Sequence, residues 1–247
     1  MNRFFIDPAL ITGSSITVPN DVSSQIRKVL RLKDGAKVRF LDNQGWSYLS
    51  EIHYVSEKEI QADVLEKSKA TGEPDCKVTL YISLTQRDKF EWILQKCTEA
   101  GVSRIIPMIT ERTLIRKVSD ISGKQQRWEA ILREAAEQCG RGLIPKLLPT
   151  ISITQAQNEN DQYDTALFCW ETEKNNTFRK FLNSQESSIR NVAIMIGPEG
   201  GFSEEEAANV IAHNWNPVTL GNRIYRMETA ALVAIVLTLY EIENDNA

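Results

Sequence analysis

Apolar and polar residues alternate with a period of two in the first third of the chain, which is typical of half-buried β-strands. The alternation covers three segments, residues 37–41, 47–52 and, less regularly, 59–65. Turn-forming residues such as Asp34-Gly35 and Asn43-Gln44-Gly45 separate them. Residues 21–32 instead carry apolar side chains at helical spacing. The pattern predicts a small β-barrel or sandwich with one short helix.

A polar segment with Gly72 and Pro74, residues 68–75, is typical of a linker, and the pattern changes after it. Runs that are apolar on both faces now alternate with helical segments, which predicts a mostly parallel sheet covered by helices on both sides. The predicted strands are residues 78–84, 104–109, 165–170, 192–196 and 218–220. The predicted helices are residues 89–100, 124–139, 204–213 and 228–243. We therefore expect two domains, residues 1–70 and 71–247.

Composition narrows the class of protein. The chain has 247 residues, of which 42% are hydrophobic and 25% charged, as is usual for a globular protein. The N-terminus lacks the apolar run of a secretory signal, and no stretch approaches the roughly 20 apolar residues of a membrane span, so a cytoplasmic protein without a membrane partner is expected. None of the four cysteines lies in a Cys-x-x-Cys pair and there are two histidines, so we expect no metal site.

The segment Ile-Gly-Pro-Glu-Gly-Gly-Phe-Ser-Glu-Glu-Glu, residues 196–206, contains three glycines directly after a predicted buried strand. Ser203, followed three residues later by Glu206, predicts a capping box at the start of a helix. The glycines let backbone groups approach a ligand closely, and strand ends of this kind usually bind ligands in α/β sheets. The alternative is a tight strand-to-helix connection without a ligand. The segment matches neither a dinucleotide-binding loop nor a nucleotide triphosphate loop.

A second loop, residues 220–228, also leaves a predicted strand through a glycine, Gly221, and enters a helix. Arg223, Arg226 and Glu228 gather just before or within the first helical turn. Taken alone, Glu228 could simply favour the positive end of the helix dipole while the arginines face water. Two such loops within some two dozen residues favour a ligand site instead.

Charge is unevenly distributed along the chain. The net charge of -4 counts against a nucleic-acid partner, yet residues 25–39 carry six positive side chains and one negative one. The positive side chains are Arg27, Lys28, Arg31, Lys33, Lys37 and Arg39. Three of them, Arg27, Lys28 and Arg31, can share one helix face. Such a patch suits the phosphates of a nucleic acid, and the alternative is a solvated basic surface.

Five segments of the sequence resemble motifs of one protein family. The two loops, with sequences IGPEGGFSEEE and LGNRIYRMETAAL, are similar to the signature of the RsmE family of SPOUT methyltransferases, which methylate N3 of a uracil in 16S rRNA. Three further stretches resemble the family in the same order along the chain: QIRKVLRLKDG, QKCTEAGV and EQCGR. The sequence departs from the family where Gln25 replaces a frequent histidine and Tyr225 replaces a common leucine.

The resemblance implies a trefoil-knotted parallel sheet preceded by a PUA-like β-barrel, and a homodimer that acts on 16S rRNA or the small ribosomal subunit. It also implies S-adenosylmethionine as cofactor. The implied cofactor-binding residues are Leu167, Phe168, Trp170, Ile196, Gly197, Pro198, Glu199, Gly200, Gly201, Leu220, Gly221, Ile224, Tyr225 and Arg226. The implied RNA-binding residues are Arg3, Arg27, Lys28, Arg31 and Lys33. The apolar last helix could form the dimer interface or pack on the sheet.

The chemistry of uracil suggests roles for two side chains. N3 must lose its proton before it can accept a methyl group, so a base or a stabilising cation is needed. We expect Arg226 to stabilise the uracil anion, and Glu228 to accept the proton or orient Arg226. Other hypotheses stay open: a knotted methyltransferase acting on tRNA or on ribose 2′-oxygens, a catalytically idle RNA-binding protein, and a nucleotide-dependent enzyme, for which no phosphate loop is found.

Overall fold

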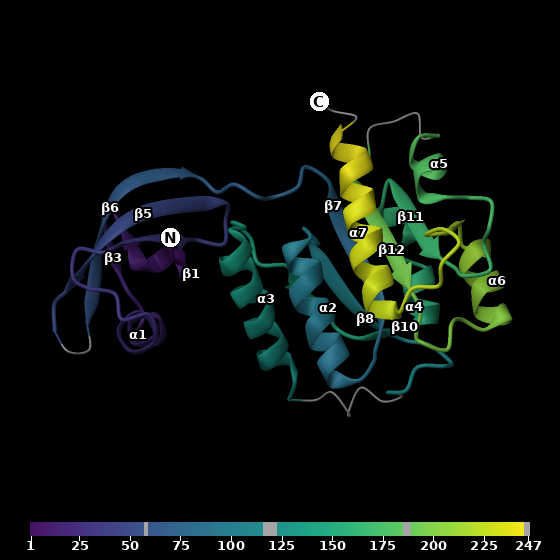
Figure 1. Ribbon diagram of the computed structural model, residues 1–247, viewed down its shortest axis with the longest axis horizontal. Helices are drawn as coiled ribbons and strands as arrows, with labels where there is room; N and C mark the ends of the chain where they lie inside the picture. The colour runs from purple at the N-terminus through teal and green to yellow at the C-terminus, as the bar shows by residue number, and fades with distance from the viewer. Residues whose placement is uncertain (57–58, 116–122, 185–188, 245–247) are drawn as a thin grey trace. The chain divides into compact units, whose positions relative to one another are not determined.

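The computed structural model describes residues 1–56, 59–115, 123–184 and 189–244 (Figure 1). The chain divides into two compact units. The first comprises Met1–Glu73 together with Arg133–Ile144, and the second comprises Pro74–Leu132 and Pro145–Ala247. The segment Arg133–Ile144 therefore belongs with the N-terminal unit, although it lies far along the chain.

The first unit is built on a six-stranded sheet with the order β1-β4-β5-β6-β3-β2. Its strands are β1 (Arg3–Phe5), β2 (Ile11–Thr12), β3 (Ser15–Thr17), β4 (Lys37–Leu41), β5 (Trp46–Tyr54) and β6 (Ile60–Lys69). The three longest strands, β4, β5 and β6, pair antiparallel, while β1 runs parallel to β4. Because β6 continues to Lys69, the predicted linker starts two residues too early.

The helical segment of the first unit is shorter than predicted. It consists of α1 (Asn20–Ser24) followed by a π-helical turn, Gln25–Val29, so the helix ends before residue 32. Arg31 has a φ of 50°, in the left-handed region, which cannot continue a right-handed helix. The prediction that Arg27, Lys28 and Arg31 share one helix face is therefore wrong, because Arg31 lies beyond the helix end.

The second unit contains a parallel sheet with the order β10-β8-β7-β12-β11-β13, and β9 pairs with β8. Its strands are β7 (Lys77–Ser83), β8 (Arg104–Ile109), β9 (Lys146–Leu147), β10 (Ile151–Ser152), β11 (Thr165–Cys169), β12 (Asn191–Ile196) and β13 (Asn216–Val218). The predicted strand at residues 218–220 is displaced toward the N-terminus. The reason is its partner, since β11 ends at Cys169, opposite Val218.

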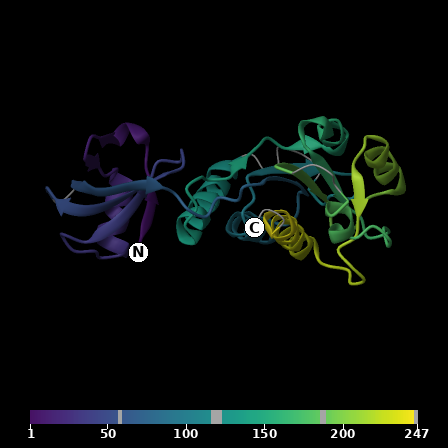
Figure 2. The ribbon, with the colours of Figure 1, turned by 90° about the horizontal axis from the view of Figure 1, so that it is seen from above.

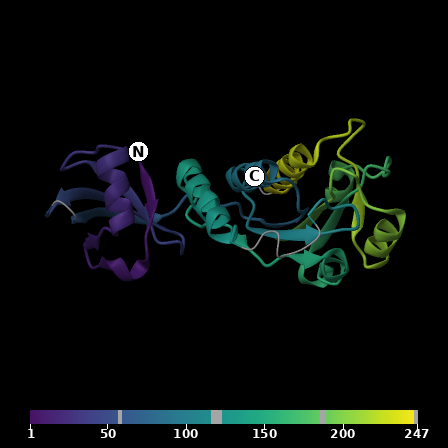
Figure 3. The same ribbon diagram turned by 90° about the horizontal axis from the view of Figure 1, so that it is seen from below.

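Helices cover both faces of this sheet, as predicted. The helices of this part of the chain are α2 (Arg87–Glu99), α3 (Gln125–Cys139), whose second half belongs to the first unit, α4 (Ile153–Gln157), α5 (Phe178–Leu182), α6 (Glu204–Ala212) and α7 (Met227–Asn244). Figures 2 and 3 show α2 and α7 on one face and α4 on the other. Ala231, Ala234 and Ile235 of α7 are fully buried, so much of its apolar surface is core. No helix in the described part of the chain is long and apolar enough to span a membrane.

Candidate active site

A cavity of about 1010 Å³ lies at the carboxyl ends of three neighbouring strands of the second unit. The last residues of β11, β12 and β13, namely Cys169, Ile196 and Val218, all line it. The loops that follow these strands supply most of the remaining wall. In an open parallel sheet, this edge is where ligands usually bind.

The cavity gathers most of the cofactor residues that the sequence predicts. Those that line it are Trp170, Ile196, Gly197, Pro198, Glu199, Gly200, Gly201, Leu220, Gly221, Ile224, Tyr225 and Arg226. Leu167 and Phe168 are not among the lining residues, because both are fully buried within β11. Phe168 packs against Phe202, with ring centroids 4.8 Å apart, and so supports the loop that follows β12.

Two glycines of the loop after β12 are sterically required. A Cβ atom on Gly197 would lie 2.6 Å from the ring of Phe202, and one on Gly201 would lie 2.3 Å from the carboxylate of Glu171. Gly201 also has a φ of +68°, in the region that favours glycine. At Gly200, in contrast, the nearest atom is Cβ of Arg112 at an ordinary 3.4 Å. The close approaches therefore concern Gly197 and Gly201 rather than Gly200.

The side chain of Glu199 ties this loop to the neighbouring strand β7 and helix α2. Its Oε1 accepts hydrogen bonds from the Thr85 hydroxyl at 2.7 Å and from Lys89 Nζ at 2.9 Å. Burial alone would raise the pKa of Glu199, but the hydrogen bonds from Lys89 and Thr85 outweigh it and lower the pKa. Glu199 is thus held as an ion-paired carboxylate whose position is fixed by two elements.

Residues after β8 also hold this loop. Nη1 of Arg112 donates to the carbonyl oxygen of Gly200 at 2.9 Å, and the backbone N–H of Glu111 donates to Glu206 at 2.7 Å. Glu206 completes the predicted capping box with Ser203 at the start of α6. Three adjacent strands, β8, β7 and β12, therefore fix the geometry of the glycine loop.

Arg226 and Glu228 reach the cavity from the start of α7. Glu228 lies in the first turn of the helix, as predicted, and Arg226 precedes it with an exposed side chain. Oε2 of Glu228 is buried and has no hydrogen-bond partner among the described residues. An unpaired buried carboxylate oxygen is costly, and at a cavity wall it is typical of a ligand or catalytic group.

Four charged residues of the cavity wall were missed by sequence reasoning: Lys89, Glu171, Glu173 and Lys174. Glu173 shapes its own loop, since its carboxylate accepts the backbone N–H groups of Asn175 and Asn176. Lys89 lies in the first turns of α2, more than 100 residues before the glycine loop, and nothing in its local sequence distinguishes it from a solvated lysine. Lys89 is identified only by its position in the folded protein, where its Nζ lies 2.9 Å from Glu199.

The predicted RNA-binding residues lie in the first unit and differ in their surroundings. Lys28, Arg31 and Lys33 are exposed. Arg27 is engaged within the protein: its Nη2 donates to the carbonyl oxygens of Ser56 and Glu59, and its guanidinium lies 4.0 Å above the ring of Tyr54. Arg27 therefore stabilises the unit, and its guanidinium group is already engaged in contacts within the protein.

Residues 72–239 of the chain match the family model described as an RNA methyltransferase domain. This match covers more than half of the chain and includes every residue that lines the cavity. The parallel sheet and its cavity therefore define a protein of the RNA methyltransferase class.

Individual relatives narrow the class. The chain is 30% identical over 233 residues to ribosomal RNA small subunit methyltransferase E of Synechocystis sp., covering 94% of the chain and 75% of the relative. It is 28% identical to the protein of the same name from Bacillus subtilis, with 98% of each covered. A crystal structure of such an enzyme from Neisseria gonorrhoeae, bound to S-adenosyl methionine, is 28% identical, with a TM-score of 0.86 over 97% of each chain. The chain belongs to the ribosomal RNA small subunit methyltransferase E (RsmE) family.

Proposed function

We propose that this protein transfers a methyl group from S-adenosylmethionine to N3 of one uridine in 16S rRNA of the small ribosomal subunit. The observation that carries the proposal is the cavity at the strand ends, where two glycine-containing loops meet Arg226 and Glu228. The names of its relatives agree, since they are called ribosomal RNA small subunit methyltransferases and one was crystallised with S-adenosyl methionine.

The cavity has the size and chemistry that this cofactor needs. Its volume of about 1010 Å³ lies at the upper end of the range for small-molecule sites. Gly197, Gly200 and Gly201 line the cavity, and residues without a side chain let backbone groups approach a ligand closely. The residues proposed to hold the cofactor are those of the three loops, with Trp170, Glu199 and Tyr225 among them.

Bound S-adenosylmethionine supplies an electrophilic methyl group on a positively charged sulfur. The task left to the protein is to bring uracil N3 to that group without its proton. Arg226 stabilises the negative charge that grows on the uracil ring, and Glu228 either accepts the N3 proton or orients Arg226. Because N3 lies on the base-pairing edge, the target uridine must be unpaired or flipped out of a helix.

Finer features of the fold belong to the same proposal. We infer that residues 71–247 form a SPOUT-type trefoil knot and residues 1–70 a PUA-like barrel. The insertion of β12 between β7 and β11 supports the knot, and the curled six-stranded sheet supports the barrel. Lys28, Arg31 and Lys33 are proposed to contact RNA, which their exposure allows.

The assembly and location are likewise proposals. We infer a homodimer in the cytoplasm, the compartment that holds ribosomes. Three apolar side chains support a further interface near the cavity and along α7: Ile224 is 89% exposed, Tyr240 64% and Val236 47%. Val236 and Tyr240 are four residues apart and so lie on one face of α7, and exposed apolar side chains that lie together often mark an association site.

Arg226 provides the test of this proposal. Arg226→Ala should lower single-turnover methylation of 16S rRNA by roughly 10²–10³, because a preorganised charge at the transition state is lost. Arg226→Lys should restore part of the rate, since it keeps the charge without the planar fork. Raising the pH should also restore part of the rate, because uracil then ionises with less help.

The matched control is Arg179→Ala, which removes an exposed arginine of the second unit that does not line the cavity and should leave the rate unchanged. Calorimetric titration with S-adenosylmethionine should show much smaller changes for Arg226→Ala than the rate does. A loss of cofactor affinity that matches the loss of rate would make Arg226 a binding group. Glu228 would then be the candidate for the chemistry.

A further inference from the structure

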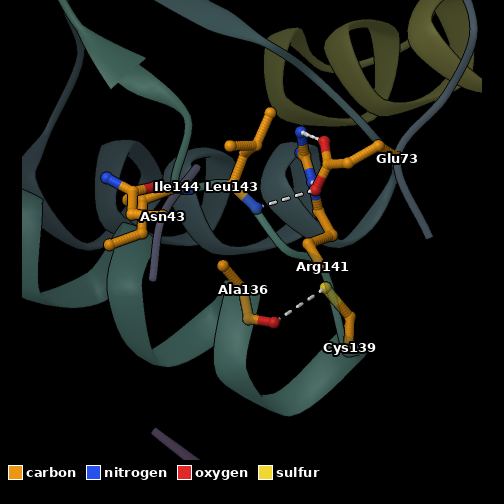
Figure 4. A network of polar contacts seen from close by, with 7 residues as sticks. All are labelled: Asn43, Glu73, Ala136, Cys139, Arg141, Leu143 and Ile144. Atoms are coloured by element: carbon orange, nitrogen blue, oxygen red, sulfur yellow. Dashed lines mark hydrogen bonds and ion pairs between the residues drawn. The ribbon is translucent and has the colours of Figure 1, made fainter. Parts of the chain in front are cut away.

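The motif Glu137-Gln138-Cys139-Gly140-Arg141 takes no part in the cavity, and it docks within the first unit instead. Oε1 of Glu137 accepts the backbone N–H of Phe5 at 2.8 Å. Arg141, which is 3% exposed, pairs with Glu73 through Nη2 and Oε2 at 2.8 Å. Figure 4 shows this pair and the N–H of Leu143, which donates to the same carboxylate. These contacts fix the end of α3 against β1.

Gly140 brings the backbone of this motif directly against Arg3 of β1. Its φ is +87°, and a Cβ atom there would lie 3.0 Å from Cζ and 3.1 Å from Nη2 of Arg3. Any other residue would be strained and would push the guanidinium aside. Gly140 follows the last residue of α3, and the negative end of a helix dipole favours a cation. Gly140 therefore leaves the space that the Arg3 guanidinium occupies at the end of α3.

A second arginine lies beside the first. Arg39 of β4 is the direct Cα partner of Arg3 in the parallel β1–β4 pair, so both side chains stand on the same face of the sheet. Nη1 of Arg39 donates to the Ser47 hydroxyl at 3.2 Å. Within the residues that the structure describes, neither arginine forms an ion pair with a carboxylate. Like charges directly opposite each other destabilise a sheet, and an anion between them removes that cost.

We propose that Arg3, for which Gly140 leaves room, and Arg39 bind one backbone phosphate of the substrate RNA. The inference rests on the proposed function, in which RNA is the substrate. Two guanidinium forks match the oxygens of a phosphate, and both side chains are partly exposed. The motif of residues 137–141 lies outside the cavity, and its proposed role is to leave room, at Gly140, for an arginine that contacts RNA.

The experiment measures binding of a 16S rRNA transcript at several salt concentrations. Replacing Arg3 and Arg39 together by Ala should weaken binding and reduce the log–log salt slope by roughly 0.7–0.9, because one phosphate contact is lost. Gly140→Ala should weaken binding as well, although both arginines remain, because the new Cβ displaces Arg3. Cofactor affinity should stay unchanged in every variant.

Lys67→Ala is the matched control, because Lys67 lies over the ring of Trp46 on the opposite face of the sheet and should leave the slope unchanged. If the double variant does not fold, the single variants Arg3→Gln and Arg39→Gln replace it, and each should weaken binding and reduce the slope by at most roughly 0.7–0.9, the value for the shared phosphate contact. An unchanged slope in folded variants that still methylate rRNA would overturn the phosphate site and leave the proposed function intact. A wild-type protein that methylates no rRNA would overturn the proposed function instead.

Discussion

Each glycine in the loop after β12 has different surroundings, and this difference can be measured. Gly201 faces the Glu171 carboxylate in a backbone conformation that favours glycine, whereas Gly200 has room for a methyl group. A new side chain at Gly201 must therefore move either the loop or Glu171, and both line the cavity.

Gly201→Ala should reduce the affinity for S-adenosylmethionine by tenfold or more, and Gly200→Ala should change it little. The expected tenfold loss corresponds to about 1.4 kcal/mol, within the usual cost of forcing an L-residue into the left-handed region. Isothermal titration calorimetry on both folded variants measures the difference. Equal affinities for the two variants would show that loop shape at Gly201 does not govern cofactor binding.

Single residues also show where sequence reasoning stops. The glycine loops, the capping box of Ser203 and Glu206, and the position of Glu228 in a first helical turn follow from local pattern, and the structure has them as expected. The engagement of Arg27 does not follow, because its partners are backbone carbonyls about 30 residues away. A count of charges along the sequence cannot distinguish an arginine that is exposed to solvent from one that forms hydrogen bonds within the protein.

The acidic side chain of Glu91 on α2 forms ion pairs with arginines of both α2 and α3. Its carboxylate accepts hydrogen bonds from Arg127 of α3 at 2.6 and 2.8 Å and from Arg87 of its own helix at 2.9 Å. The hydrogen bonds from Arg127, and then those from Arg87, outweigh the effect of burial and lower the pKa of Glu91 from 4.5 to about 2. The ionised carboxylate therefore stabilises the contact between the helices.

This contact predicts a pH-dependent stability. Glu91→Gln should lower the free energy of unfolding at neutral pH by about 1 kcal/mol, a value suited to a pair with an exposed partner. Because the pKa is lower in the folded state, the contribution is complete above pH 4.5 and is lost as the pH falls through about 2. Urea unfolding of both proteins across this range measures it, and Arg127→Gln should show the same trend. A difference that does not vary with pH would contradict the assignment.

At the scale of elements, long periodic segments were predictable and short ones were not. Strands β4, β7, β8 and β12 and helices α2, α3, α6 and α7 lie within a few residues of their predicted bounds. Short strands such as β1 and β10 carry too few residues for a period to show. The position of β13 depends on where β11 ends, and the π-helical turn, Gln25–Val29, departs from the 3.6-residue period of an α-helix. Neither is contained in a local pattern.

The whole molecule joins distant parts of the chain at both of its candidate sites. In the second unit, the cavity combines Lys89 with loops more than 80 residues further on. In the first unit, Arg133–Ile144 packs with Met1–Glu73. The sequence predicts one domain boundary, because the amino-acid composition changes at one linker. Composition does not show that a later segment, Arg133–Ile144, packs with the N-terminal unit.

The central claim is that the cavity serves methylation of one uridine in 16S rRNA. The direct test is incubation of the protein with labelled S-adenosylmethionine and small ribosomal subunits, or their rRNA, from a strain that lacks the enzyme. Mass spectrometry of the digested RNA then locates the label. The account predicts one methyl group per 16S rRNA molecule, on N3 of a single uridine, and none with Arg226→Ala. Label on tRNA, on a ribose 2′-oxygen, or on no RNA at all would contradict it.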